Sequence, residues 1–131
     1  MDDTVRAFVE KYRSAAMITA RANGKAHVAR CNVNVVNGKL WSSGTEDRVR
    51  TRNLRRDPRA TLFIWGDDRA WVGIEAGVTM LSGPEGWQGN LDLRQSMGRN
   101  PEPVAFLKEM EEEGRLIYEF EITRVYGAYK D

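Results

Sequence analysis

Apolar and polar residues alternate along much of the chain with the two-residue period of a β-strand. The clearest example lies near the C-terminus, where one face of a predicted strand is apolar: Leu116, Tyr118, Phe120 and Ile122. The opposite face carries Glu119, Glu121 and Thr123. This pattern predicts a strand with one side in a core and one side in water.

Two Asn-Gly pairs, Asn23-Gly24 and Asn37-Gly38, predict hairpin turns, because both residue types tolerate the positive φ that a two-residue turn requires. The first turn would join strands at 16–20 and 26–36, and the second would lead into a strand at 39–43. Residues 61–65 are apolar without alternation, so we expect both faces of that strand to be covered, by the barrel interior and by a helix or partner. A longer strand is expected at 70–81.

Helical periodicity appears at residues 4–12, and an arginine-rich helix is expected to end before Asp57-Pro58, since a residue preceding proline disfavours the α region. The stretch 87–113 reads as two helical pieces separated by Asn100-Pro101, with Gly114 as a C-cap. This order of elements predicts a mainly β (α+β) fold, a small antiparallel barrel. A Rossmann fold is disfavoured because no Gly-x-Gly-x-x-Gly opens a helix.

Six arginines fall within the twelve residues 48–59: Arg48, Arg50, Arg52, Arg55, Arg56 and Arg59. Asp47 and Asp57 only bracket the run, so the guanidinium groups are expected to have few local partners. With Thr45 capping the helix and Arg48 and Arg50 near its start, the segment predicts an anion site, and a phosphorylated cofactor as its occupant. A solvated basic helix face is the alternative interpretation.

The 131 residues predict a single domain, 1–131, and the formal net charge of +1 argues against nucleic-acid binding by bulk electrostatics. A nucleic-acid site confined to residues 48–59 stays open as an alternative. Cys31 is the only cysteine and His27 the only histidine, so we expect no intrachain disulfide and no metal site. No apolar segment approaches membrane-spanning length, and we expect a cytoplasmic protein.

Four segments together resemble the split-β-barrel flavin and deazaflavin proteins related to pyridoxamine 5′-phosphate oxidase: residues 23–28, 51–62, 73–77 and 124–127. The run Asn-Leu-Arg-Arg-Asp-Pro-Arg at 53–59 is most similar to the actinobacterial F420 (deazaflavin)-dependent reductases. The resemblance covers nearly the whole chain, from about Phe8 to Tyr126. It implies a homodimer of six-stranded FMN-binding-type split barrels, with two cofactors in grooves between the subunits.

The resemblance also implies which residues hold the cofactor phosphate. A basic pair stands at the positions of Arg48 and Arg50, assisted by the hydroxyl at Ser43 and by the start of the helix. The commonest pattern has lysine where Arg50 stands. Arginine keeps the charge and adds a planar fork for phosphate oxygens, so we expect phosphate binding to persist.

Four further residues are implied on the ring and tail side of the cofactor. His27 and Arg30 correspond to positions that line the ring and tail, with an exposed strand residue and a surface salt bridge as the alternative interpretations. Trp65 and Gly66 end the strand that runs beside the cofactor ring. For Trp65, packing in the core or in a dimer interface is the alternative.

The implied function is hydride transfer from reduced F420 to an electron-poor double bond of a small organic acceptor. The chain offers no evident acid–base pair or nucleophile triad, which agrees with chemistry supplied by a cofactor. The alternatives are an FMN-binding oxidase or flavin reductase of the same fold, and a non-catalytic cofactor-binding protein. Pyridoxamine phosphate oxidation itself is not expected, because the Arg-x-His element associated with it does not appear before Asp131.

Overall fold

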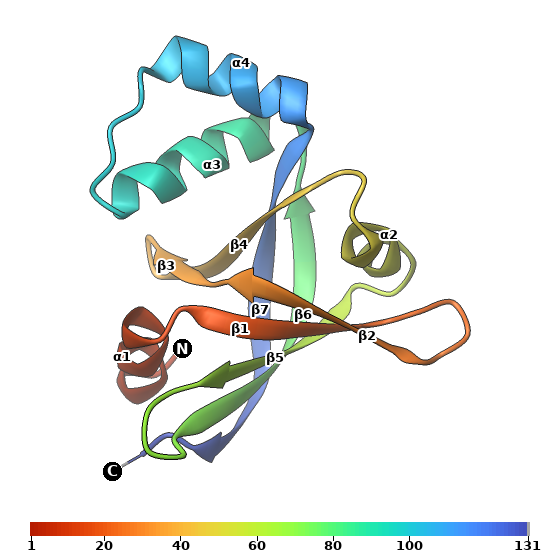
Figure 1. Ribbon diagram of the computed structural model, residues 1–131, viewed down its shortest axis with the longest axis vertical. Coiled ribbons are helices and arrows are strands. Elements are labelled where there is room, and N and C mark those ends of the chain that lie inside the picture. The colour runs from red at the N-terminus through yellow and green to blue at the C-terminus, as the bar shows by residue number, and fades with distance from the viewer. Residues whose placement is uncertain (131) are drawn as a thin grey trace.

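The computed structural model describes residues 1–130, and within them one curled antiparallel sheet has the strand order β2-β1-β5-β6-β7-β4-β3 (Figure 1). The strands are β1 (Ser14–Ala20), β2 (Ala26–Asn32), β3 (Asn34–Val36), β4 (Lys39–Thr45), β5 (Arg59–Trp65), β6 (Trp71–Leu81) and β7 (Arg115–Ala128). The helices are α1 (Asp3–Lys11), α2 (Val49–Arg56), α3 (Gly83–Ser96) and α4 (Pro103–Glu113). The mainly β (α+β) split-barrel class expected from the sequence is therefore confirmed.

The strand expected at 26–36 is two strands, which is why the sheet has seven strands and not six. The break falls at Val33, whose amide donates to the Arg13 carbonyl at 2.9 Å and whose side chain is fully buried. β3 then forms a three-residue hairpin with β4 across Asn37-Gly38. Both turn residues have positive φ, 51° and 77°, as the Asn-Gly signal predicts.

The inner face of the sheet forms the main core. Met17 of β1, Leu62 of β5, Ile74 of β6 and Leu116 of β7 are fully buried there, and α1 closes one end of the barrel with Val9. Asp2 is the N-cap of α1, and its side chain accepts from the Val5 amide at 2.8 Å and so satisfies one free N–H of the first turn.

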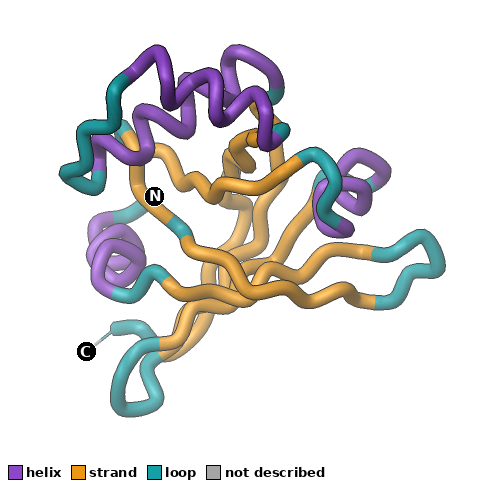
Figure 2. The backbone as a smooth tube through the Cα atoms, turned by 45° about the horizontal axis from the view of Figure 1, so that its top comes forward, coloured by secondary structure: helices purple, strands orange, loops and turns teal. Residues whose placement is uncertain are grey.

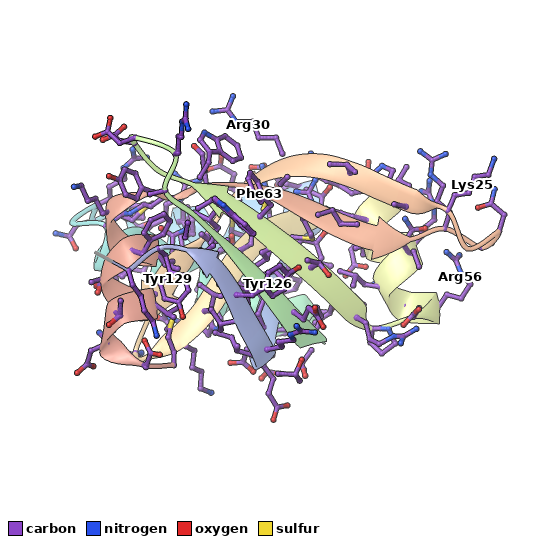
Figure 3. The ribbon with its side chains drawn as sticks, turned by 90° about the horizontal axis from the view of Figure 1, so that it is seen from below. Lys25, Arg30, Arg56, Phe63, Tyr126 and Tyr129 are labelled. Atoms are coloured by element: carbon purple, nitrogen blue, oxygen red, sulfur yellow. The ribbon has the colours of Figure 1, made fainter. Side chains whose placement is uncertain are left out.

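Within residues 1–130 the opposite face of β5 carries partly exposed aromatic side chains, so the expected cover by a partner stays a prediction. The strand alternates, with Ile64 buried but Phe63 and Trp65 respectively 38% and 44% exposed. Phe63 lies 5.6 Å from the Trp71 ring, and Trp71 packs edge-on against Tyr126 at 6.0 Å. We call these four aromatic residues the outer aromatic face; Figure 3 shows Phe63 and Tyr126 on this side of the sheet.

The predicted helical insert is present as α3 and α4, which pack together at one end of the sheet (Figure 2). It begins at Gly83, four residues before the expected Trp87, and Gly114 ends α4 with a φ of 64°, as the C-cap prediction requires. α3 covers the second face of β7, so Ile117 is as fully buried as Leu116. None of the helices within 1–130 has the length and apolar character needed to cross a membrane.

α2 is attached to β1 by one buried and one exposed polar contact. The Asn53 amide donates to the Thr19 hydroxyl at 3.1 Å, and both side chains are buried. Arg56 donates to the Ala20 carbonyl at 2.9 Å. The helix ends at Arg56 with Asp57 as C-cap, which confirms the stop predicted from Asp57-Pro58. This anchoring sets the position of the first turn of α2, where the candidate site lies.

Candidate functional site

A hollow of about 660 Å³ opens where the start of α2 faces the edge of β2. It is lined by His27, Ala29, Thr45, Asp47, Arg48, Val49, Arg50 and Glu113, and we call it the α2 hollow. Its walls come from β2, the end of β4, the first turn of α2 and the last residue of α4 (Figure 1). Four of the residues predicted to bind the cofactor meet here: His27, Thr45, Arg48 and Arg50.

Four of the six clustered arginines have partners within the chain, so the expectation of few local partners is wrong for them. Arg52 donates to the Asp47 carbonyl at 3.0 Å, Arg55 pairs with Glu46, Arg56 binds the Ala20 carbonyl, and Arg59 makes two 2.9 Å bonds to Asp57. The side chains of Arg48 and Arg50 make no hydrogen bond and no ion pair with any residue of 1–130. The two arginines without partners are the two that line the hollow.

Arg50 is an unusual cation because its side chain is only 7% exposed. Its Nε is buried without a hydrogen-bond partner, and the guanidinium carbon lies 5.6 Å from the centre of the Tyr118 ring. A buried charge without a counter-ion is costly, and a bound anion would remove that cost. Arg50 therefore has the environment of a ligand-binding group rather than of a solvated helix face.

Thr45 does not cap α2, contrary to the sequence-based expectation. The helix begins at Val49, Arg48 occupies the N-cap position without a side-chain cap bond, and the Thr45 hydroxyl donates to Asp47 Oδ1 at 2.6 Å. The reason is a turn between Thr45 and Arg48, closed by a 3.3 Å backbone bond, which delays the helix. The amides of Val49 and Arg50 are left unpaired in the first turn and add donors beside the guanidinium groups.

Two carboxylates also line the hollow. The pKa of Asp47 is lowered, first by the Thr45 hydroxyl, then by its own backbone amide and by the nearby charges of Arg48 and Arg52. Asp47 is therefore anionic at neutral pH. Glu113 is paired with Arg115 at 3.0 Å. The positive charge that the hollow offers to a ligand is thus partly balanced within its own lining.

Ser43 lies outside the α2 hollow. Its hydroxyl donates to Asn90 Oδ1 of α3 at 2.5 Å, and Asn90 Nδ2 in turn donates to the Gly86 carbonyl at 2.8 Å. In this chain Ser43 therefore joins β4 to the helical insert. Its expected contact with the phosphate stays a prediction.

Arg30, Trp65 and Gly66 are also not brought into the α2 hollow. Arg30 is an exposed residue of β2 without an ion pair to any described residue, and Figure 3 shows it projecting from the sheet near Phe63. Trp65 stacks on Phe63 at 6.0 Å, within the outer aromatic face. A Cβ at Gly66 would lie 2.8 Å from the Tyr12 ring, so this position requires glycine for packing. Contacts of these residues with a cofactor stay a prediction.

The sequence reasoning missed two residues that support the site, Tyr118 and Thr51. Both are fully buried, and their hydroxyl oxygens lie 2.5 Å apart beneath Arg50. The alternation of the last strand marks Tyr118 as a core residue, but no sequence spacing indicates that its ring lies under an arginine from α2. Glu113 was missed for the same reason, because it reaches the hollow only through the packing of α4.

Cys31 is buried behind the site, as expected for a small core residue. Burial raises its pKa, and the Ser42 side chain and the Arg50 charge oppose that shift only in part.

We expect iodoacetamide to alkylate Cys31 at pH 8 much more slowly in the native protein than in urea. Because the pKa of Cys31 is higher in the folded protein, the stability that the protonated thiol contributes should be fully present below about pH 8.5, where an unfolded thiol ionises. That contribution should decline as the pH rises toward the folded pKa. Native and unfolded alkylation at equal rates would contradict this prediction.

A family model described as pyridoxamine 5′-phosphate oxidase matches residues 1–129, almost the entire chain. The chain belongs to the pyridoxamine 5′-phosphate oxidase family. Membership of this family supports a flavin-related redox function in general terms. It also agrees with a hollow lined by Arg48 and Arg50, which have no hydrogen-bond or ion-pair partner within residues 1–130, because flavin cofactors carry phosphate.

Solved structures share the fold at low sequence identity. A conserved hypothetical protein from Mycobacterium tuberculosis superposes with a TM-score of 0.76 at 17% identity, over 98% of this chain and 85% of that one. A structure described as an F420 reductase gives 0.71 at 18% identity, over 92% and 94%. The heme storage protein HutZ from Vibrio cholerae gives 0.71 at 11% identity, over 94% and 91%. At such identities these structures support the fold of this pyridoxamine 5′-phosphate oxidase family member, while its ligand has to be argued from its own residues.

Proposed function

We propose that this protein is an F420-dependent oxidoreductase that holds the cofactor phosphate in the α2 hollow. When bound and reduced, F420 would supply a hydride to an electron-poor double bond of a small organic acceptor. The observation that carries the proposal is that Arg48 and Arg50 alone among the six clustered arginines lack a partner within residues 1–130, and both line the hollow.

The residues of the hollow supply three kinds of phosphate donor. Arg50 offers a buried guanidinium, Arg48 offers an exposed one, and the free amides of Val49 and Arg50 point out of the first turn of α2. His27, whose Nδ1 is buried without a partner, is the group we expect beside the cofactor ring.

FMN is the alternative occupant, and the charges in the hollow favour F420 over it. The FMN phosphate is a monoester that approaches two negative charges at pH 7, whereas the F420 phosphate is a diester with one. Asp47 offsets part of the positive charge of the hollow, which suits a singly charged phosphate better, whereas Glu113 is already paired with Arg115. Asp47 is exposed, so water and salt screen this preference.

The outer aromatic face supports a homodimer. Phe63 and Trp65 are partly exposed beside Trp71 and Tyr126, and an apolar surface of this kind is typical of a protein–protein interface. A second copy seated there would bring Arg30, Trp65 and Gly66 of one subunit toward the cofactor of its partner. That arrangement would explain why these three residues lie away from the α2 hollow of their own chain.

Phe63→Asp is therefore expected to convert a dimer into a monomer at micromolar concentration, because a charge would be buried in an apolar interface. Sedimentation equilibrium measures the change. Val104→Asp is the matched control, since Val104 lies on α4 and is 76% exposed. A parent protein that is already monomeric, or a Phe63→Asp variant that stays dimeric, would contradict this dimer.

The function is tested by tryptophan-fluorescence titration with F420 and, separately, with FMN. The account predicts saturable quenching by both, with the lower dissociation constant for F420. Reduced F420 should then be reoxidised by an electron-poor acceptor only in the presence of the protein, as followed by its visible absorbance. Tighter binding of FMN would move the assignment to an FMN-dependent enzyme. Binding of F420 without turnover over a broad acceptor screen would indicate a cofactor carrier.

A further inference from the structure

A buried ring lies directly beneath the arginine that we assign to phosphate binding. Tyr118 is fully buried near the start of β7, paired with Ser42 on one side and Met80 on the other. The Arg50 guanidinium carbon lies 5.6 Å from the centre of its ring. The face of an aromatic ring is negative and attracts a cation, more strongly where water is excluded.

The hydroxyl of Tyr118 is held by a chain of hydrogen bonds with a fixed direction. Thr51 Oγ1 lies 2.7 Å from the Thr45 carbonyl, which can only accept, so the single hydroxyl proton of Thr51 is donated there. The Tyr118 hydroxyl, 2.5 Å from Thr51 Oγ1, must then be the donor in that second bond. The ring is thereby attached to the first turn of α2 and to the end of β4, the two segments that flank Arg48.

Gly44 provides the space for this ring. A Cβ built at Gly44 would collide with the hydroxyl and ring carbons of Tyr118, so no other residue fits without moving the ring. Its φ is not in the left-handed region, and the requirement for glycine comes from the close approach alone. The backbone of β4, the ring and the α2 helix are thus in contact beneath Arg50.

We propose that Tyr118 is the positioning residue of Arg50: its buried ring holds the guanidinium in place for the phosphate. This inference rests on the proposed phosphate site. The ring of Tyr118, and not its hydroxyl, interacts with Arg50, because the hydroxyl is hydrogen-bonded to Thr51. Arg50 has no carboxylate partner among the described residues that could hold its guanidinium instead.

Three variants separate positioning from ordinary core packing. Tyr118→Phe keeps the ring and loses the hydroxyl, while Tyr118→Leu loses the ring. Phe120→Leu is the matched control, because Phe120 is a buried aromatic on the same face of β7, two residues away, with no contact to Arg50. Affinities for F420 and for its phosphate-free deazariboflavin core are measured for each variant, with FMN and riboflavin as a second pair.

Tyr118→Leu is expected to weaken binding of the phosphorylated member of each pair at least tenfold while changing the phosphate-free member less than threefold. Tyr118→Phe should stay within threefold of the parent for both, and Phe120→Leu should leave the ratio unchanged. A structural defect alone would weaken both members of a pair together. The proposal is overturned if Tyr118→Leu keeps the parent ratio, or if Tyr118→Phe loses as much as Tyr118→Leu.

A second measurement needs no cofactor and so separates this inference from the proposed function. In ¹⁵N NMR spectra the Arg50 Nε–H signal, identified by its loss in Arg50→Lys, should be shifted upfield by the Tyr118 ring current. The shift should persist in Tyr118→Phe and Phe120→Leu and vanish in Tyr118→Leu. If the Arg50 Nε–H signal of the parent has the chemical shift of an ordinary arginine, the contact between Arg50 and Tyr118 is refuted, even where Tyr118→Leu does not fold. A shifted signal in a protein that binds neither cofactor supports the contact and refutes only the cofactor site.

Discussion

Arg50→Ala is expected to weaken the binding of F420 by about tenfold to a hundredfold. A hydrogen bond to a charged group contributes about 1.5–3 kcal/mol, and every 1.4 kcal/mol changes a dissociation constant about tenfold. Arg50 should reach the upper part of this range because its guanidinium is buried and has no other partner to satisfy it. Fluorescence titration of the variant and the parent measures the change.

Arg52→Ala is the matched control for that prediction. Arg52 lies two positions further along the same helix and carries the same charge, but it is not among the residues that line the hollow, and its guanidinium donates to the Asp47 carbonyl. Its removal should change the affinity for F420 less than threefold. Equal losses in the two variants would mean that only the bulk charge of α2 attracts the cofactor, and an unchanged affinity in Arg50→Ala would contradict the phosphate site.

Arg50→Met is expected to make the cofactor-free protein more stable than the parent by about 1–3 kcal/mol. A buried charge without a counter-ion costs free energy, and an apolar side chain of similar volume removes that cost, although the loss of the contact with Tyr118 offsets part of the gain. Urea unfolding measures the difference.

The same variant should lose the stabilisation that the cofactor gives to the parent. At a free concentration one hundred times the dissociation constant, F420 should raise the free energy of unfolding of the parent by about 2.7 kcal/mol. Arg50→Met should show little of this increase at that concentration. A variant that is less stable than the parent and is still stabilised by F420 would contradict the claim that the charge of Arg50 lowers stability in the cofactor-free protein and binds the cofactor phosphate.

Features set by neighbouring residues could be predicted from the sequence. The hairpin turns, with positive φ at Gly24 and at Asn37-Gly38, the end of α2 at Asp57-Pro58 and the cap at Gly114 all depend on the preferred φ and ψ of one or two residues. The resemblance to a known family supplied the rest of the fold. Val33 shows the limit, because its bond to the distant Arg13 divides a strand that the sequence pattern predicts to be continuous.

Features set by distant segments could not be predicted in this way. The sequence identifies six arginines as a cluster, but the partners of Arg55 and Arg56 lie 9 and 36 residues away in the chain, at Glu46 and Ala20. Only folding shows that Arg50 is left without a partner. The outer face of β5 shows the same limit, since an unbroken apolar run does not say whether a helix or a second chain is to cover Phe63.

The most direct test of the phosphate site is a crystal structure of the protein with F420. The account predicts the phosphate in the α2 hollow, accepting hydrogen bonds from the Arg50 guanidinium and from the amides at the start of α2, with Arg48 beside it. A phosphate bound elsewhere, with Arg50 still unpaired above Tyr118, would contradict the account.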